Sequence, residues 1–301
     1  MKKKSLTAGE VLFQVINYTV FALFTLACII PFYYLLINTI SDNDLVSRGQ
    51  ILLLPKGVHF GNYVEILKVK GLGNSALVSL GRTVLGTIGT LLGTCFLGYA
   101  LSKQELWKRK IWYRFVVITM YFNAGIIPWY INMKNLGMTN NFWAYVIPSI
   151  VSPFSLILFK TYVESIPASL EESADLDGAG YLRKFFVLIV PLSKPIIATI
   201  AVFSAVNQWN SFMDTLFLMT DSNLYSLQFM LYQYLNEANS LADTLRQAAS
   251  QGGSNIDVST LLTPTSIKMT VSMVVVIPIL LVYPFFQRFF VGGIMIGAVK
   301  G

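Results

Sequence analysis

The sequence predicts an all-α polytopic membrane protein with six transmembrane helices and both termini in the cytoplasm. Its 301 residues have a mean hydropathy of +0.61, and 54% of them are hydrophobic while only 12% are charged. That composition is too apolar for an ordinary soluble domain of this length. The basic residues, which give a formal net charge of +7, are scattered between apolar runs. This distribution favours membrane orientation over binding to nucleic acid.

The first two apolar runs, 13–38 and 77–101, are expected to cross the membrane, because a bilayer core needs roughly 20 mostly apolar residues. The first follows "MKKKSLTAGE", which is similar to the charged start of a signal peptide. Its apolar run is too long for a signal peptide and no small-residue cleavage site closes it, so a retained helix is expected. The second contains "GTIGTLLG", whose glycines share one face. Such a face favours close helix packing, within the bundle or against a second subunit.

The third and fourth runs, 112–132 and 142–163, are bounded by the polar segments "KQELWKRK" and "NMKNLGMTNN". The fifth, 195–219, follows an acidic stretch, and the sixth, 267–290, follows a long polar segment. Prolines within these runs interrupt backbone hydrogen bonding and permit kinks. Together the six helices are expected to form a single transmembrane domain over residues 1–301.

The lysines and arginines orient these helices, because cytoplasmic loops are enriched in them. With both termini inside, most of the 22 basic residues fall on the cytoplasmic side. The acidic stretch between the fourth and fifth runs is then cytoplasmic too, as part of a loop at 164–194. The strongest evidence is a dense basic cluster in the short loop after the second run, formed by Lys103, Lys108, Arg109, Lys110 and Arg114.

The stretch "EESADLDGAGYLRKFFVLIVPLSKP", residues 171–195, gathers four carboxylates at its start in an otherwise apolar chain. Ser169 and Glu172 fit a capping box at a helix start, and Gly178 fits a corner at the end of that helix. A second helical segment follows, with Lys184 on its polar side, and ends at prolines. Anionic headgroups would repel such an acidic platform, so a basic protein surface is its expected partner.

This stretch resembles the EAA loop of ABC-importer permeases, whose pattern is roughly E-A-A-x-x-D-G-A followed by I-x-x-P-x-x-x-P. Ser173 replaces the usual second-position alanine, a change between two small residues. The resemblance implies a type I ABC importer permease fold, in which this loop lies in a cleft of a cytoplasmic ATPase subunit and transmits closure of the ATPase dimer. The residues so assigned to ATPase coupling are Glu171, Glu172, Ala174, Asp177, Gly178 and Ala179, and Pro191 and Pro195 match the end of the pattern.

The resemblance extends along nearly the whole chain, through "GNYVEILK", "NQWNSFMDTLF" and "YPFFQRFFVGGIMIGAVKG". These segments look like carbohydrate-type permeases similar to the second maltose-transporter permease, above all the subgroup for polysaccharide or complex-oligosaccharide import. The resemblance implies a bacterial cell-membrane subunit that pairs with a second homologous permease, two copies of a sugar-type ATPase subunit and an extracytoplasmic substrate-binding lipoprotein. It also implies a C-terminal tail that reaches the ATPase dimer, the alternative being a short amphipathic end resting on the membrane.

The sequence contains few residues that would indicate an enzyme active site. No phosphate-binding G-x-x-x-x-G-K-[ST] loop occurs, so ATP and magnesium are expected on the partner ATPase and no cofactor is expected in this chain. The single histidine, His59, argues against a histidine-based metal site. Cys28 and Cys95 lie in apolar runs without a CxxC neighbour and are expected to be packing residues. The alternatives to a sugar permease are a permease of the same fold for a non-sugar solute and a polytopic membrane enzyme.

The segment "VNQWNSFMD" in the fifth run is the expected place of sugar contact, because aromatic faces with amide or carboxylate groups bind sugars. Its polar residues at i, i+3, i+4 and i+7 share one helix face, which would be costly toward lipid. An interfacial aromatic belt, polar packing against the partner permease and direct substrate contact all remain open for this segment. Arg82 is expected to snorkel from the start of the second helix. The candidate substrate-pathway residues are Asn207, Trp209, Asn210, Ser211 and Asp214.

Overall fold

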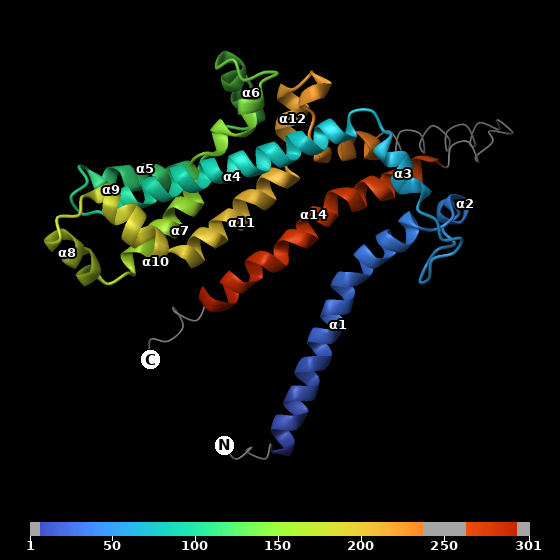
Figure 1. Ribbon diagram of the computed structural model, residues 1–301, viewed down its shortest axis with the longest axis horizontal. Helices are drawn as coiled ribbons and strands as arrows, with labels where there is room; N and C mark the ends of the chain where they lie inside the picture. Colours follow the sequence, from blue (N-terminus) through green and yellow to red (C-terminus); the bar gives the residue numbers. More distant parts are fainter. Residues whose placement is uncertain (1–6, 237–262, 294–301) are drawn as a thin grey trace. The chain divides into compact units, whose positions relative to one another are not determined.

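The computed structural model describes residues 7–236 and 263–293, and these ranges fold into helices joined by turns and short loops (Figure 1). No strand occurs within them, which confirms the predicted all-α class for this part of the chain. The chain divides into two compact units. One comprises Met1–Val69 and Tyr234–Val274, and the other comprises Lys70–Gln233 and Val275–Gly301.

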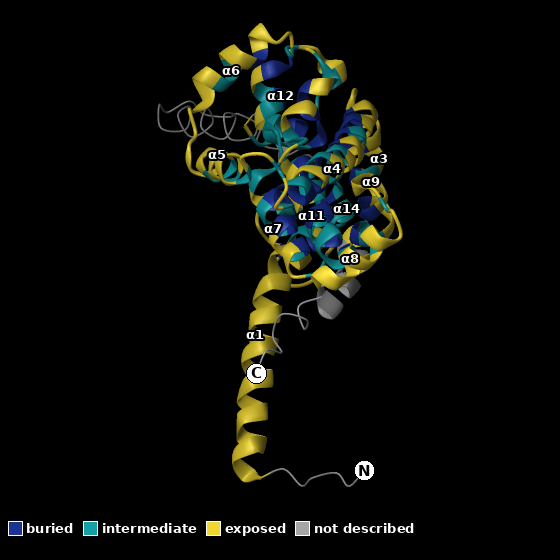
Figure 2. Ribbon diagram, turned by 90° about the vertical axis from the view of Figure 1, so that its left-hand side faces the viewer, coloured by how far each residue is buried: buried dark blue, intermediate teal, exposed yellow. Residues whose placement is uncertain are grey.

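The first unit begins with α1 (Ala8–Thr39), a helix of 32 residues. The Thr7 hydroxyl accepts a hydrogen bond from the Glu10 N–H at 3.4 Å, and the Glu10 carboxylate accepts one from the Thr7 N–H at 2.8 Å. This capping box starts the helix at Ala8, before the predicted residue 13. Apolar side chains of α1 are exposed along most of its length (Figure 2), which suits a helix that faces lipid or another chain.

Two short helices follow in the first unit, α2 (Asn43–Ser47) and α3 (Gly61–Leu67). The Asn62 side-chain amide donates to the Thr39 carbonyl at 3.0 Å, which ties α3 to the end of α1. A small apolar core joins the same end of α1 to α2 and the residues after it, and it contains Ile37, Val46 and Ile51.

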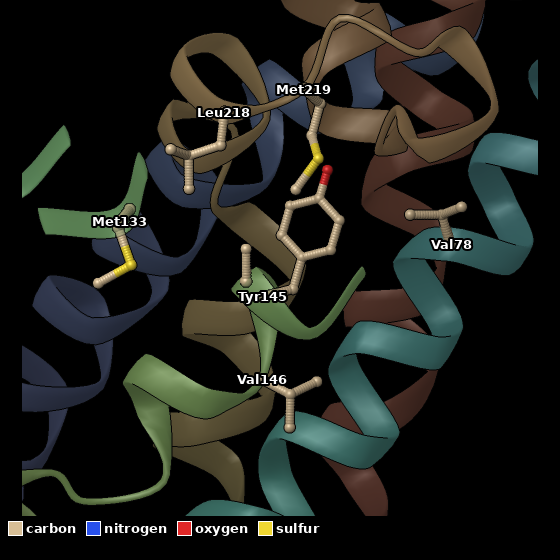
Figure 3. Packing of buried hydrophobic residues seen from close by; sticks show 7 residues of the cluster. Val78, Met133, Tyr145, Val146, Leu218 and Met219 are labelled. Atoms are coloured by element: carbon tan, nitrogen blue, oxygen red, sulfur yellow. The ribbon is translucent and has the colours of Figure 1, made fainter. Parts of the chain in front are cut away.

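The second unit is organised around α4 (Leu72–Ser102), against which α7 (Pro153–Glu164) and α11 (Lys194–Asn210) pack (Figure 1). Cys95 is buried here as predicted, whereas Cys28 is exposed on α1. Two apolar cores bind these helices to their neighbours. One, shown in Figure 3, contains Val78, Met133, Ala144, Tyr145, Val146, Leu218 and Met219. The other contains Cys95, Tyr99, Phe159, Val163, Phe185, Ile189 and Ile200.

Glycines on α4 set the close approach of its neighbours. A Cβ atom at Gly86 would lie 2.4 Å from the side-chain nitrogen of Gln208 on α11. A Cβ atom at Gly93 would lie 2.7 Å from the backbone oxygen of Ile150. A side chain at Gly93 would collide with the backbone of Ile150, and one at Gly86 would displace the Gln208 amide. The predicted packing of this glycine face inside the bundle is therefore confirmed.

The third predicted run is bent rather than straight. It forms α5 (Arg109–Tyr121) and α6 (Ile126–Asn135), which meet at an angle of 118°. Gly125 lies at the bend with φ +87°, a conformation that glycine adopts without strain. The Asn123 side chain accepts a hydrogen bond from the Gly125 N–H at 2.9 Å and stabilises the turn.

The fourth and fifth predicted runs are also broken. The short 3₁₀ segments η1 (Phe142–Tyr145) and η2 (Ile147–Ser149) precede α7 at an angle of 40°. In the fifth run α11 ends at Asn210, and α12 (Met213–Leu218) begins after a two-residue break. The segment η4 (Ser222–Leu224) and a helical stretch at 227–236 follow α12.

The sixth predicted run corresponds to α14 (Thr263–Gly293), which begins before the predicted residue 267 and contains Pro278 and Pro284. Within the described residues, α1 and α4 are long and apolar enough to cross a membrane unbroken. Three bent pairs of helices reach that length only together. The count of six spans and the cytoplasmic termini therefore stay predictions.

Candidate functional site: an acidic helix and a polar cavity

The acidic stretch folds as the predicted helix, corner and second helical segment. Its first helix is α8 (Ala168–Leu176), and the corner follows at Gly178. The second segment consists of α9 (Tyr181–Arg183), the π-helical η3 (Lys184–Ile189) and α10 (Val190–Leu192).

One face of α8 is held by lysines from other elements. Glu171 and Asp175, four residues apart, share this face because four residues make about one helical turn. The Glu171 carboxylate accepts hydrogen bonds from Lys103 Nζ. The Asp175 carboxylate accepts one from Lys184 Nζ at 2.7 Å, and this hydrogen bond raises the pKa of Lys184. Half of the acidic cluster is therefore neutralised inside the chain.

The face of α8 that lies about 100° around the helix from Glu171 is open. Glu172 and Leu176, also one turn apart, are exposed, and the Leu176 side chain is 91% accessible. Within the described residues Glu172 makes no ion pair or hydrogen bond through its side chain. Asp177, at the C-cap, is exposed as well. Glu172 and Leu176 are therefore both accessible to a partner chain.

The corner after α8 is a Schellman motif. The Gly178 N–H donates to the Asp175 carbonyl at 3.0 Å, and the Ala179 N–H donates to the Ala174 carbonyl at 2.9 Å. Gly178 has φ +71°, so the predicted positive φ at this corner is confirmed. Ala174 and Ala179 are both partly buried.

Gly178→Val is expected to disturb this corner, because a side chain at positive φ is disfavoured by about 1–2 kcal/mol. With the coupling role that the resemblance implies for α8, an ATPase partner should still bind this variant, while ATP hydrolysis becomes uncoupled from transport. Gly180→Val is the matched control, since Gly180 has φ −69° and, like Gly178, has open space within 4 Å of the position that a Cβ atom would take. Assays of ATP turnover and of uptake, run in parallel, test this prediction. Equal losses of uptake in Gly178→Val and Gly180→Val would contradict it.

Two expectations for this stretch are wrong. Ser169 does not cap the helix, which begins at Ala168 with Pro167 at the N-cap and no side-chain capping bond. Pro167 has φ −56° and lacks an N–H group, and α8 begins at the next residue. Lys184 does not face solvent either, since its side chain is only 7% exposed. Lys184, the first residue of the π-helical η3, contacts Asp175 and the Tyr181 ring instead.

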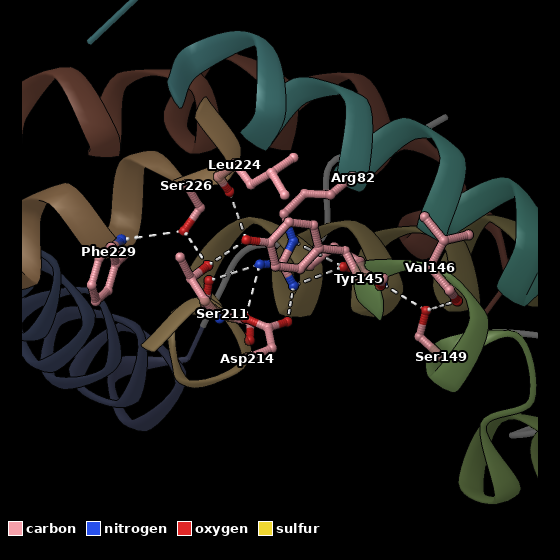
Figure 4. A network of polar contacts seen from close by, with 11 residues as sticks. Arg82, Tyr145, Val146, Ser149, Ser211, Asp214, Leu224, Ser226 and Phe229 are labelled. Atoms are coloured by element: carbon pink, nitrogen blue, oxygen red, sulfur yellow. Dashed lines mark hydrogen bonds and ion pairs between the residues drawn. The ribbon is translucent and has the colours of Figure 1, made fainter. Parts of the chain in front are cut away.

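A network of polar groups surrounds Arg82 in the second unit (Figure 4). The Arg82 side chain is 2% exposed and forms an ion pair with Asp214. Its Nε donates to Gln208 Oε1 at 3.2 Å, and one terminal nitrogen donates to the Ser211 carbonyl at 3.2 Å. The guanidinium lies 4.3 Å from the ring centroid of Tyr145. Every nitrogen of Arg82 is therefore occupied, and the buried charge is compensated.

A cavity of about 460 Å³ lies beside this network. The side-chain amide of Asn207 borders it and has no hydrogen-bond partner within the described residues. Phe154 and Phe203 are exposed to it, and Trp129 is partly exposed. Its remaining polar lining is Thr90, Ser149, Ser152, Ser155, Ser204, Gln208 and Ser211, with the Arg82–Asp214 pair. Aromatic faces together with hydroxyl and amide groups can bind a polyhydroxylated ligand.

The candidate substrate-pathway residues separate into two groups. Asn207, Ser211 and Asp214 line the cavity. Trp209 instead donates from Nε1 to the Val275 carbonyl at 3.0 Å and borders an apolar cavity of about 230 Å³. Asn210 uses its amide to bond the Val206 carbonyl at 3.0 Å. Three of the four residues of the predicted shared face therefore line one cavity, although α11 ends at Asn210 and the face is not a continuous helix face.

Sequence reasoning missed Arg82, which was expected to snorkel toward water. The sequence did carry a signal for this pairing. Arg82 and Asp214 are opposite charges within two different predicted spans, and charged residues inside a membrane usually pair with one another. Gln208 lies in the same quoted segment but was not among the candidate substrate-pathway residues. Its amide donates to the Tyr145 carbonyl at 3.0 Å and to Ser149 Oγ at 2.7 Å, so it links α11 to η1 and η2.

The sequence from residue 6 to residue 296 matches the family described as binding-protein-dependent transport system inner membrane component. The chain belongs to this family. The permease is 34% identical to the "Polygalacturonan/rhamnogalacturonan transport system permease protein YtcP" of Bacillus subtilis (strain 168), over 96% of the chain and 99% of that protein. It is also 34% identical to "Protein LplC" of the same organism, over 91% of the chain and 90% of that protein.

A solved structure has the same fold. It is described as a bacterial ABC transporter involved in the import of the acidic polysaccharide alginate. The permease matches it with a TM-score of 0.82 and 28% identity, over 96% of this chain and all of that one. The predicted kinship with carbohydrate-type ABC-importer permeases is confirmed, and the permease is a membrane transport subunit. The C-terminal tail lies outside the described residues, so its expected contact with the ATPase stays a prediction.

Proposed function

We propose that the permease imports oligosaccharides or complex glycans, forming a translocation pathway with a second, homologous permease. The observation that carries this proposal is the cavity beside Arg82, with its aromatic walls and unpaired Asn207 amide. Its volume of about 460 Å³ lies in the range of ~300–1,000 Å³ typical of ligand sites. The relatives named for polygalacturonan, rhamnogalacturonan and alginate transport support the same substrate class.

ATP hydrolysis belongs, in this proposal, to two copies of a cytoplasmic sugar-type ATPase subunit that binds ATP and magnesium. The exposed face of α8, with Glu172, Leu176 and Asp177, receives that subunit. The basic cluster at 103–114 keeps this end of the helices in the cytoplasm, with six spans and both termini inside. An extracytoplasmic lipoprotein delivers the sugar at the opposite side. The permease itself holds no cofactor and catalyses no reaction.

The proposal is tested by uptake in proteoliposomes that contain the permease with its partner permease, ATPase and binding lipoprotein. The solutes are labelled neutral oligosaccharides, uronate oligosaccharides and, as non-sugar probes, an oligopeptide and a polyamine. We expect ATP-dependent uptake of a sugar, and we expect Phe203→Ala to reduce it about three- to tenfold, because an aromatic contact contributes on the order of 1 kcal/mol.

Phe60→Ala is the matched control, since Phe60 is an exposed phenylalanine that does not line the cavity. Uptake of a non-sugar probe alone would support the alternative, a permease of the same fold for another solute. Two results would show that the cavity does not bind the sugar. In one, both substitutions reduce sugar uptake equally; in the other, neither substitution reduces it.

A further inference from the structure

We propose that Lys103 and Lys184 are positioning residues, which anchor α8 to the two chain segments that also carry the polar cavity. The inference rests on the proposed coupling role of α8 and assigns a different task to each of its faces. The outer face docks the ATPase. The inner face transmits its movement through two ion pairs, Lys103–Glu171 and Lys184–Asp175, called here the anchor pairs.

The need for anchoring follows from the burial of α8. None of its nine residues is buried, so no apolar core holds this helix in place. Apart from its chain connections at Pro167 and Gly178, the anchor pairs are the ionic attachments of α8 within the described residues. A helix without such attachments would tilt on its two ends when a partner pulled on it, and little motion would reach the bundle.

The first anchor pair is well placed to resist movement. Lys103 is the C-cap residue of α4, so its backbone is fixed to the end of a long helix. Its Nζ bonds both carboxylate oxygens of Glu171 and lies 4.4 Å from the ring centroid of Tyr99, which is buried. The side chains of Lys103 and Glu171 are 16% and 19% exposed. Partial burial weakens screening by water, so this pair is stronger than a surface pair.

The second anchor pair joins α8 to the segment that leads into α11. Lys184 is the first residue of η3, and its Nζ lies 4.8 Å from the Tyr181 ring centroid and 2.7 Å from Asp175. Phe185, the next residue, is packed in the apolar core that contains Cys95 and Phe159. Lys184 is therefore rigidly held, although Asp175 itself is more than half exposed.

Both anchored segments continue to the cavity. Along α4, Arg82 lies 20 residues before Ser102, which is roughly 30 Å of continuous helix. From η3 the chain passes through α10 and, after a bend of 83°, into α11, which carries Gln208. Arg82 and Gln208 bond each other at 3.2 Å in the network beside the cavity. A displacement of α8 therefore acts on the two helices that meet at the substrate cavity, and on both at once.

The test uses the complete importer in proteoliposomes with its partner permease, ATPase and binding lipoprotein. Asn207→Cys, in a Cys28→Ser background, reports on the cavity through its labelling by a membrane-impermeant maleimide. Labelling rates are compared without nucleotide and after trapping with ATP, magnesium and vanadate. We expect Lys103→Glu and Glu171→Lys to bind the ATPase within about twofold of the parent, because the docking face is intact. We expect each to reduce the nucleotide-dependent change in labelling by roughly fivefold or more.

The exchanged double variant, Lys103→Glu with Glu171→Lys, should restore both the pair and the labelling change. Lys103→Met should behave like Lys103→Glu, and Lys110→Glu, the same charge change at an exposed lysine of α5, should behave like the parent. Single variants that keep the labelling change would overturn the anchor, as would an exchanged variant that fails to recover it. A parent protein whose labelling rate does not change on trapping would contradict the proposed coupling function itself. The failure of the coupling function is therefore distinguishable from the failure of the anchor pairs.

Discussion

Glu172→Lys is expected to weaken binding of the ATPase to the permease by more than about tenfold. Glu172 is exposed and has no ionic partner of its own within the described residues, so its charge is available to a cation of the docked subunit. Losing one partner of a desolvated charge pair costs on the order of 2–5 kcal/mol. Reversing the charge adds repulsion to that loss. Uptake should fall with ATPase binding, while the fold of the permease stays intact.

Pull-down of the ATPase at graded concentrations measures this effect, with the melting temperature of the permease followed in parallel. Glu65→Lys is the control, because it makes the same charge change at an exposed residue of α3, on a segment expected outside the cytoplasm. Glu171→Lys offers a second comparison, since Glu171 faces Lys103 and should affect transmission more than binding. Unchanged ATPase binding by Glu172→Lys would mean that α8 is not the docking element.

Arg82→Met is expected to destabilise the permease by about 3–5 kcal/mol, because it leaves a partly buried Asp214 carboxylate without its partner. The same substitution removes the donors to Gln208 and to the Ser211 carbonyl, which lies at the end of α11. The break between α11 and α12 should loosen as a result, and the wall of the cavity with it. Uptake should be lost even where folded protein remains in the membrane.

The double variant Arg82→Met with Asp214→Asn distinguishes the effect of the unpaired Asp214 charge from the effect of the lost Arg82 side-chain contacts. Removing the orphaned charge should recover part of the lost stability, as seen in the melting temperature in detergent or nanodiscs. Arg48→Met is the control, since Arg48 is exposed and the loss of an exposed charge has little effect. An Arg82→Met variant as stable as Arg48→Met would show that the ion pair contributes nothing to the fold.

The sequence by itself determined the helical class, the apolar runs and the corner at Gly178. Apolar runs and positive-φ glycines are local features, so their physics acts within a few residues and can be read along the chain. The acidic stretch was found in the same way, and so was the close packing of the α4 glycines. The element ends were less certain: α1 begins at a Thr7–Glu10 capping box, and α8 begins at Ala168, directly after Pro167, without a cap from Ser169.

Only the tertiary structure decided which charged side chains pair with one another and which stay exposed. Arg82 meets Gln208 and Asp214, which lie 126 and 132 positions away in the chain, and no local pattern encodes such pairings. The division of the α8 acids also depends on distant partners, since Lys103 lies 68 positions from Glu171. The Glu171 carboxylate pairs with Lys103 in a partly buried place. Glu172, the next residue, points about 100° away around the helix and has no such partner in the part of the chain that the structure describes. That rotation, and the position of the two lysines, leave Glu172 as the exposed acid and Glu171 as the anchored one.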